Sequence, residues 1–189
     1  MVGKVLGLAF NDVSPVKIDG KIIKSYDCWT DMLNRCYSTR IQIAQPRYVG
    51  CSVAEEWLLF SNFKLWFDPR YRPGYELDKD LLAHGNRIYS SDTCVLIPTA
   101  LNLFTTGRPS KGANTLQGVT RRSANCYRAR IGGKKNHEVI GNFRTEKEAH
   151  LAWFNRKIEL AYEYKELCDS IDPRLFEGVL RKIHSMKEV

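Results

Sequence analysis

Hydrophobic residues recur at helical spacing in two segments of the N-terminal half. One helix face over residues 26–37 carries Trp29, Met32, Leu33 and Cys36. Residues 53–67 carry Trp57, Phe60, Phe63 and Phe67. This period predicts amphipathic helices, and large aromatic residues within it indicate core packing rather than a ligand platform. We therefore expect two helices, joined by a polar connection over residues 38–50.

Residues 75–106, which we call the finger, follow a different pattern. Their central stretch, residues 77–102, reads LDKDLLAHGNRIYSSDTCVLIPTALN. Residues 75–80 and 87–89 predict two strands around a Gly85-Asn86 turn, and Pro98 fits the first turn of a following helix. Asp78 would end the first strand and Asn102 would look back at it from the helix. Oxygen ligands of this kind suit hard divalent cations. A plain β-hairpin with charged tips fits the same pattern equally well.

Shorter turn signals predict further hairpins. Asp19-Gly20 lies at the centre of residues 16–23, where it predicts a small hairpin. Further along, residues 118–122, 127–131 and 137–143 predict three short strands separated by turns. Thr145 followed by Glu148 predicts a capping box at the start of a helix over residues 146–164. The alanines of this helix would allow it to approach the sheet closely.

The segment TTGRPSKGAN, residues 105–114, has the composition of a linker, with Gly, Pro and polar residues and no large apolar side chain. We place the domain boundary here. The predicted organisation is a first domain over residues 1–108, a linker over 109–115, a second domain over 116–165 and a helical tail over 166–189. Asp172-Pro173 is expected to break that tail.

The balance of charge points to a polyanionic partner. The 189 residues include 43% hydrophobic and 26% charged residues, which is ordinary for a globular protein. The net charge of +8 is not ordinary, and it favours nucleic acid as a partner over an anionic membrane surface. No segment has membrane-spanning length, and residues 1–10 are too short for a signal peptide. We expect a cytoplasmic protein, in the host cytoplasm if it is phage-encoded.

The six cysteines show no tight pairing pattern and no Cys-x-x-Cys motif. They are interpreted best as buried or free thiols of a reducing compartment. Zinc ligation by Cys28, Cys36, Cys51 and Cys94 is the less favoured alternative.

The predicted second domain concentrates the basic residues. Between residues 116 and 145 there are seven Lys or Arg residues and one acid, Glu138. Alternation along residues 127–131 puts Ala129 and Ile131 on one face and Arg128 and Arg130 on the other. A basic, twisted three-stranded sheet can enter a major groove and present arginine to guanine. A merely solvated basic sheet is the alternative.

The finger resembles the HNH (ββα-metal) nuclease fold, on the order of its residues Asp78, Lys79, Gly85-Asn86, Tyr89, Cys94 and Asn102. It is similar to phage proteins with a degenerate HNH motif before an AP2-like DNA-binding module. Upstream residues match those proteins too, namely Tyr26, Trp29, Met32, Arg35-Cys36-Tyr37, Val53, Trp57, Phe60 and Phe63. The resemblance covers most of the chain.

The resemblance implies roles for the finger residues. Asp78 and Asn102 take the metal-ligand positions, for one Mg²⁺ or Mn²⁺ ion. Lys79 stands where the catalytic histidine base of active HNH enzymes is found, and an ammonium group has no lone pair with which to accept a proton. Water would then be activated by His84, Asp80 or a neutral Lys79.

Residues 116–165 resemble the AP2 DNA-binding domain. The matching residues are Gly118-Val119, Tyr127, Ala129, Ile131, Gly141, Phe143, Thr145, Glu148-Ala149 and Trp153. The DNA-contact positions of that family correspond here to Gln117, Thr120, Arg122, Tyr127 and Arg130. The neighbouring basic residues Arg121, Arg128, Lys134, Lys135 and Arg144 complete the expected DNA-binding set. Gln117 and Thr120 stand where arginine is frequent in that family, so the base preference does not transfer.

Two hypotheses follow. The fold is expected to be α+β, with a ββα-metal, HNH-like finger and aromatic-rich helices before an AP2-like three-stranded antiparallel sheet packed on a helix. The first hypothesis is a metal-dependent DNA endonuclease of phage homing or nicking type, which acts on double-stranded DNA. The second is a DNA-binding or regulatory protein on an HNH scaffold that has lost its chemistry, with Lys79 as a phosphate contact.

Overall fold

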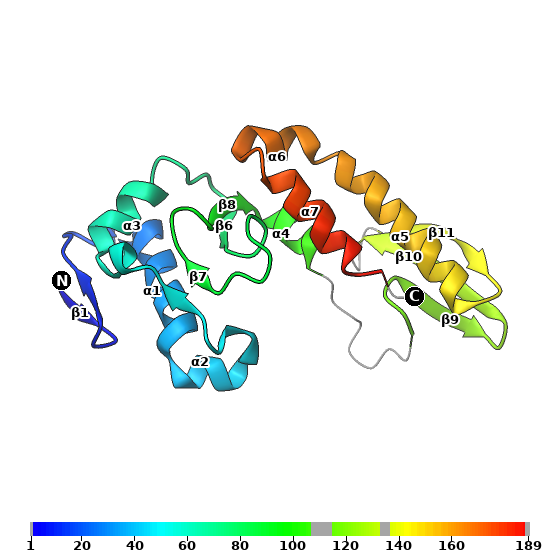
Figure 1. The fold of residues 1–189 in the computed structure, drawn as a ribbon, viewed down its shortest axis with the longest axis horizontal. Helices are drawn as coiled ribbons and strands as arrows, with labels where there is room; N and C mark the ends of the chain where they lie inside the picture. Colours follow the sequence, from blue (N-terminus) through cyan, green and yellow to red (C-terminus); the bar gives the residue numbers. More distant parts are fainter. Residues whose placement is uncertain (1, 107–114, 133–136, 188–189) are drawn as a thin grey trace. The chain divides into compact units, whose positions relative to one another are not determined.

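The structure, a computed structural model, describes residues 2–106, 115–132 and 137–187 and has a mixed α+β fold (Figure 1). Contacts divide the chain into two compact units, Met1–Thr99 and Ala100–Val189. The linker expected at 109–115 falls largely on residues outside the described part, and the division by contacts comes earlier, after Thr99.

The first unit consists of short elements around two main helices. Its strands are β1 (Gly3–Val5), β2 (Ala9–Asn11), β3 (Lys17–Ile18), β4 (Lys21–Ile22), β5 (Ser52–Val53), β6 (Tyr75–Asp78), β7 (Ile88–Tyr89) and β8 (Val95–Pro98). Its helices are α1 (Lys24–Tyr37), α2 (Thr39–Ala44) and α3 (Phe60–Phe67), with short 3-10 turns η1 (Pro46–Tyr48) and η2 (Glu55–Leu58). The turn between β3 and β4 lies at Asp19-Gly20, and both residues have positive φ (50° and 75°), as a tight hairpin turn requires. The hairpin prediction is confirmed.

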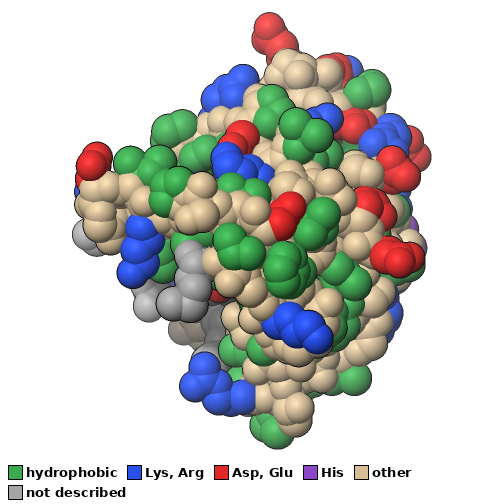
Figure 2. All heavy atoms as spheres, turned by 90° about the vertical axis from the view of Figure 1, so that its left-hand side faces the viewer, with side chains coloured by type: hydrophobic (Ala, Val, Ile, Leu, Met, Phe, Trp, Pro, Cys, Tyr) green, Lys and Arg blue, Asp and Glu red, His purple; other side chains and the backbone are tan. Residues whose placement is uncertain are grey.

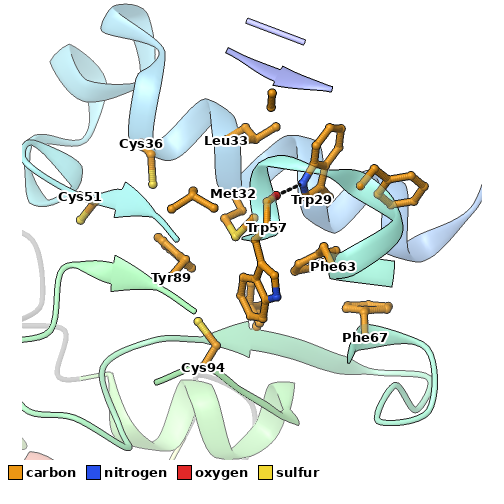
Figure 3. Packing of buried hydrophobic residues seen from close by; sticks show 14 of the residues in the cluster. Trp29, Met32, Leu33, Cys36, Cys51, Trp57, Phe63, Phe67, Tyr89 and Cys94 are labelled. Carbon is orange, nitrogen blue, oxygen red and sulfur yellow. Dashed lines mark hydrogen bonds between the residues drawn. The ribbon is translucent and has the colours of Figure 1, made fainter. Parts of the chain in front are cut away.

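The core of this unit is built by the two predicted apolar stripes. All eight residues of the stripes are buried, and the helix predicted over 26–37 is α1. The indole Nε1 of Trp29 donates a hydrogen bond to the Trp57 carbonyl at 2.7 Å, which ties α1 to η2 inside the core (Figure 3). The Trp57 and Phe63 rings meet edge to face, with centroids 5.0 Å apart. Aromatic burial therefore holds α1, η2 and α3 together.

One expectation about this region was wrong in detail. Residues 53–67 do not form one continuous helix, because Val53 belongs to strand β5 and only α3 is α-helical. The backbone N–H of Ala54 donates a hydrogen bond to the Tyr89 carbonyl, at 2.8 Å, instead of taking part in a helix. The polar connection over residues 38–50 contains the short helix α2 and the turn η1, the latter started by Pro46.

The strand pairing of the finger also differs from the prediction. Strand β6 pairs antiparallel with β8, Asp78 opposite Val95 and Tyr75 opposite Pro98, whereas β7 pairs in parallel with β5. Residues 95–97 are apolar and buried, and this burial favours the pairing of β8 with β6. Pro98 is the last residue of β8 rather than the first turn of a helix, and helix α4 (Thr99–Thr105) starts one residue later.

The second unit is a three-stranded antiparallel sheet covered by helices. Its elements are β9 (Val119–Ser123), β10 (Cys126–Gly132), β11 (His137–Phe143), α5 (Glu146–Tyr162), α6 (Lys165–Ile171) and α7 (Leu175–His184). The strand order is β11-β10-β9, and α5 packs on one face of the sheet (Figure 1). The three predicted strands, the Thr145–Glu148 capping box and the break of the tail near Asp172 are confirmed.

The contact between α5 and the sheet is closest at Gly118. This glycine has φ +80°, and a Cβ atom built on it would overlap the Trp153 ring. The neighbouring His150 is buried, and its Nδ1 lies 2.8 Å from the Gln117 carbonyl oxygen. The backbone before β9 therefore lies directly under two rings of α5. Helix α7 packs on α5 as well, where the rings of Phe154 and His184 are 5.7 Å apart.

We predict that Gly118→Ala destabilises the second unit by about 3 kcal/mol or more, because overlap with a buried ring adds to an unfavourable left-handed backbone. Urea denaturation followed by tryptophan fluorescence measures the loss. Gly85→Ala is the matched control, since Gly85 also has positive φ (69°) but open space around it. Equal losses in the two variants would contradict the proposed close approach.

Candidate nucleic-acid interface and finger

One face of the three-stranded sheet is left open by the helices. Cross-strand pairs share a face, and Ala129 pairs with Val119 and Gly141 on the side of α5. The next row, Thr120, Arg128 and Asn142, therefore belongs to the opposite face, as does the pair of Arg130 with Val139. We call this side the open face.

The register is interrupted twice on this sheet. A bulge between Ala129 and Arg130 leaves Ile140 without a partner residue in β10, and another shift lies between Cys126 and Tyr127. Bulges bend a strand and increase its twist. The open face is therefore a twisted surface.

Arg128, on the central strand, is held in place on the open face. Its Nε donates a hydrogen bond to the Asn142 Oδ1 at 3.1 Å across the strands. The two terminal nitrogens of its guanidinium lie beyond this bond and form the fork that recognises phosphate or guanine. Asn142 was not among the expected site residues, although the strand alternation in the sequence could have indicated it.

The other expected DNA-binding residues lie in different places. Arg122 and Arg130 are exposed, and Arg122 lies at the bulge of β9, where the register leaves it without a partner residue in β10. Tyr127 pairs with Arg121 and Phe143 and is half-buried. The backbone carbonyl oxygen of Gln117 lies within hydrogen-bond distance of the His150 ring. Arg144 is exposed just after β11. Lys134 and Lys135 lie outside the described residues. The residues of the open face are thus Thr120, Arg128, Arg130 and Asn142, and the exposed Arg122 lies at the bulge beside them.

The carboxylate of Asp78 organises the turn after β6. Its Oδ1 accepts hydrogen bonds from the backbone N–H groups of Asp80 and Leu81, both at 2.8 Å. This is a local cap on the chain as it leaves the strand. The side chain is only half-buried, so the carboxylate combines a structural role with access to solvent.

Lys79 is buried, and its ammonium group is used inside the finger. Its Nζ forms an ion pair with Asp80, donates to the Asn86 carbonyl at 3.1 Å and lies 5.8 Å from the centre of the Tyr89 ring. The Asn86 amide in turn donates to the carbonyls of Lys79 and Ile88, at 2.9 and 2.7 Å. Lys79 and Asn86 therefore close the loop over residues 79–88. The sequence marked Asn86 only as a turn residue.

The remaining finger residues lie in different segments. His84 is exposed in the loop, and Asp80 is engaged by Lys79. Asn102 lies in α4, where its carbonyl accepts a hydrogen bond from the Thr105 hydroxyl at 3.0 Å. Asp78 belongs to the first unit and Asn102 to the second, so an ion shared by these two residues stays a prediction.

The described residues contain no group of three or more His, Cys, Asp or Glu that could hold a metal ion. All six cysteines are free thiols. Burial raises the pKa of both Cys28 and Cys36 to about 12, which disfavours the thiolate form that a metal requires. An Asp and an Asn alone would leave most of the coordination sphere of a Mg²⁺ ion to water and phosphate oxygens.

Comparison with protein-family models, curated proteins and solved structures found no match to this chain. Among the described helices, none has the length and apolar character needed to span a membrane. Inferences about function therefore depend on the residues themselves.

The helix that carries Asn102 is anchored within the second unit by a buried lysine. Lys157 of α5 donates to the Phe104 carbonyl at 2.6 Å, and its Nζ lies 3.7 Å from the centre of the Phe104 ring. The rings of Phe104 and Tyr164 are 5.0 Å apart. Burial lowers the pKa of Lys157 to about 8. The ammonium group thus donates to one carbonyl beside an aromatic ring, in a site where burial disfavours its charge.

We predict that Lys157→Met removes a pH dependence of stability. The pKa of Lys157 is about 8 in the folded chain and near 10.5 when unfolded, so between these values the unfolded chain binds more protons. The contribution of Lys157 to the free energy of unfolding therefore rises with pH across this window. Urea denaturation at pH 7 to 10.5 should show this rise in the wild type minus Lys157→Met difference. Lys147→Met, an exposed change on the same helix, should give a flat difference, and a flat difference for Lys157 would refute the assignment.

Proposed function

We propose that this protein binds double-stranded DNA through the open face of its second unit. The observation that carries the proposal is that Arg128 and Arg130 lie on the side of the sheet that α5 leaves uncovered, with the exposed Arg122 at the neighbouring bulge. The acid of this sheet, Glu138, pairs with Arg156 of α5 and so does not neutralise them. Such a face offers positive charge without internal compensation, which suits a phosphate backbone.

The shape of the face supports duplex DNA as the partner. A three-stranded sheet with a helix behind it can lie in a major groove, and arginines on alternating positions of its central strand then reach base edges. The twist added by the two bulges suits the curvature of a groove. The likeness of residues 116–165 to the AP2 domain agrees with this mode of binding.

We predict that the triple variant Arg122→Ala/Arg128→Ala/Arg130→Ala binds duplex DNA more weakly and with less salt dependence. Each lost phosphate contact should lower the slope of log affinity against log salt by about one unit. Fluorescence anisotropy with a labelled duplex at several salt concentrations measures both quantities. The control replaces three exposed lysines of the helical side, Lys147, Lys182 and Lys187, by alanine. A folded sheet variant that binds with the wild-type slope would refute the proposal.

Metal-dependent cleavage of DNA is the second candidate function. It is favoured by the half-exposed Asp78 carboxylate at the end of β6, followed by an exposed His84 and then by the helix of Asn102. This order is that of an HNH-like finger. The finger differs from an active HNH enzyme at the position of the catalytic base, where Lys79 stands in place of histidine. Lys79 is buried and forms an ion pair with Asp80. In a catalytic finger, Asp78 would hold the divalent ion at the scissile phosphate and His84 would accept the proton of water.

The cleavage hypothesis predicts nicking of supercoiled plasmid that requires Mg²⁺ or Mn²⁺ and is lost in Asp78→Ala, while affinity for DNA stays within about twofold. The physical reason is that Asp78 supplies the anionic ligand of the ion but lies outside the open face. His84→Ala should also abolish nicking, whereas Asp92→Ala, an exposed acid later in the same stretch, should not. Nicking that is equal in the wild type and Asp78→Ala, or absent with both metals, would leave a DNA-binding protein without nuclease activity.

A further inference from the structure

The first unit carries a second group of arginines, at the end of α1 and in the segment after α2. Residues 32–54 contain three arginines and no aspartate or glutamate. Two of them, Arg35 and Arg47, approach the same aromatic ring, that of Tyr48, with their guanidinium carbons 5.6 and 4.9 Å from its centre. A third guanidinium, from Arg87, donates to the carbonyl of Val49. We call Arg35, Arg47, Tyr48 and Arg87 the Tyr48 surface.

This surface is anchored to the core by Arg35. The guanidinium of Arg35 is near the hydroxyl of Tyr89, a residue that is 2% exposed, and its charge acts on that hydroxyl. Arg47 is held by the Gln45 side chain at 2.7 Å, and Arg87 lies against Gly50, where an added Cβ would be 3.6 Å from its Nη1. Arg47 and Arg87 are themselves exposed. The positions of these cations are thus defined by neutral partners, while the charges of Arg47 and Arg87 face solvent.

The charges on the Tyr48 surface are not neutralised by the protein. Within the described part of the chain, no ion pair involves Arg35, Arg47 or Arg87. Asp31 is the acid whose charge acts on Arg35, and it lies one turn earlier on α1. Two guanidinium groups at one ring repel each other, and a ligand of negative charge would relieve that repulsion. The face of an aromatic ring also attracts cations and keeps them in place.

We propose that the Tyr48 surface binds the phosphate backbone of duplex DNA as a second contact, on a different unit from the open face. Planar guanidinium groups bond phosphate oxygens in pairs, and arginine is the residue best suited to this geometry. Contacts to the phosphate backbone carry no sequence information, so this surface adds affinity without sequence choice. The identification of the polyanion as duplex DNA rests on the function proposed above.

The test uses the full chain and the double variant Arg47→Ala/Arg87→Ala. Its slope of log affinity for a labelled duplex against log salt should fall by about two units, because two phosphate contacts are lost. The matched control is Arg70→Ala/Arg72→Ala, in the same unit, because Arg70 is also exposed and stacks on an aromatic ring, 5.2 Å from the centre of Trp66. Arg47→Lys/Arg87→Lys keeps the charge and should retain most of the slope. Circular dichroism and urea midpoints establish that each variant is folded.

The outcomes separate this proposal from the function proposed above. A wild-type slope in Arg47→Ala/Arg87→Ala, or the same fall in the Arg70/Arg72 control, overturns the second contact and leaves the open face untouched. If the slope falls in Arg47→Ala/Arg87→Ala but is unchanged in the triple variant of the sheet, DNA binding by the open face is overturned and the proposal for the Tyr48 surface is supported. Equal slopes and affinities for duplex RNA of the same sequence would overturn the assignment to DNA. If the wild type does not bind duplex DNA, both proposals fail.

Discussion

The close approach of the Trp153 indole to the Gly118 backbone is the contact on which the second unit depends. A side chain at position 118 would overlap the ring, so α5 can lie flat on the sheet only above a glycine. Ala129 and Ala149, both fully buried, allow the same closeness elsewhere in this interface. Because α5 covers one face so closely, the arginines of the central strand must lie on the other. The proposed DNA-binding face is thus a consequence of small residues beneath a helix.

The first unit is stabilised differently, because its strands are too short for strand pairing alone to stabilise them. Two to four residues per strand give few ladder hydrogen bonds, so stability must come from the aromatic core. The bond from Trp29 to the Trp57 carbonyl satisfies the indole in that core and fixes α1 against η2. The finger is supported from the same core, since Tyr89 and Cys94 belong to the cluster (Figure 3).

The two units distribute charge in similar ways. Cations at the open face and on the Tyr48 surface are positioned by neutral groups, by Asn142 in one case and by Tyr48 and Gln45 in the other. Lys79 and Arg156 behave differently, since acids compensate them. On the face seen in Figure 2, cations, acids and hydrophobic side chains are intermixed. The contrast between compensated and uncompensated cations is what distinguishes the proposed contact surfaces from ordinary solvated charge.

The sequence by itself determined those features whose signals are local. The apolar stripe of α1, the turn at Asp19-Gly20 and the capping box of α5 were predictable because period, backbone φ and cap chemistry act within a few residues. The strands of the second unit were predictable for the same reason, since they follow one another around short turns. Of the candidate site, the alternation of Arg128 and Arg130 was predictable in the same way.

Only the tertiary structure decided which distant segments meet. The pairing of β6 with β8, the parallel contact of β5 with β7 and the burial of Lys79 depend on partners that no local pattern specifies. The bond from Asn142 to Arg128 and the convergence of Arg35 and Arg47 on Tyr48 are of the same kind. A one-dimensional pattern states which face a side chain takes, whereas its neighbours are chosen by the burial of apolar surface across the whole unit.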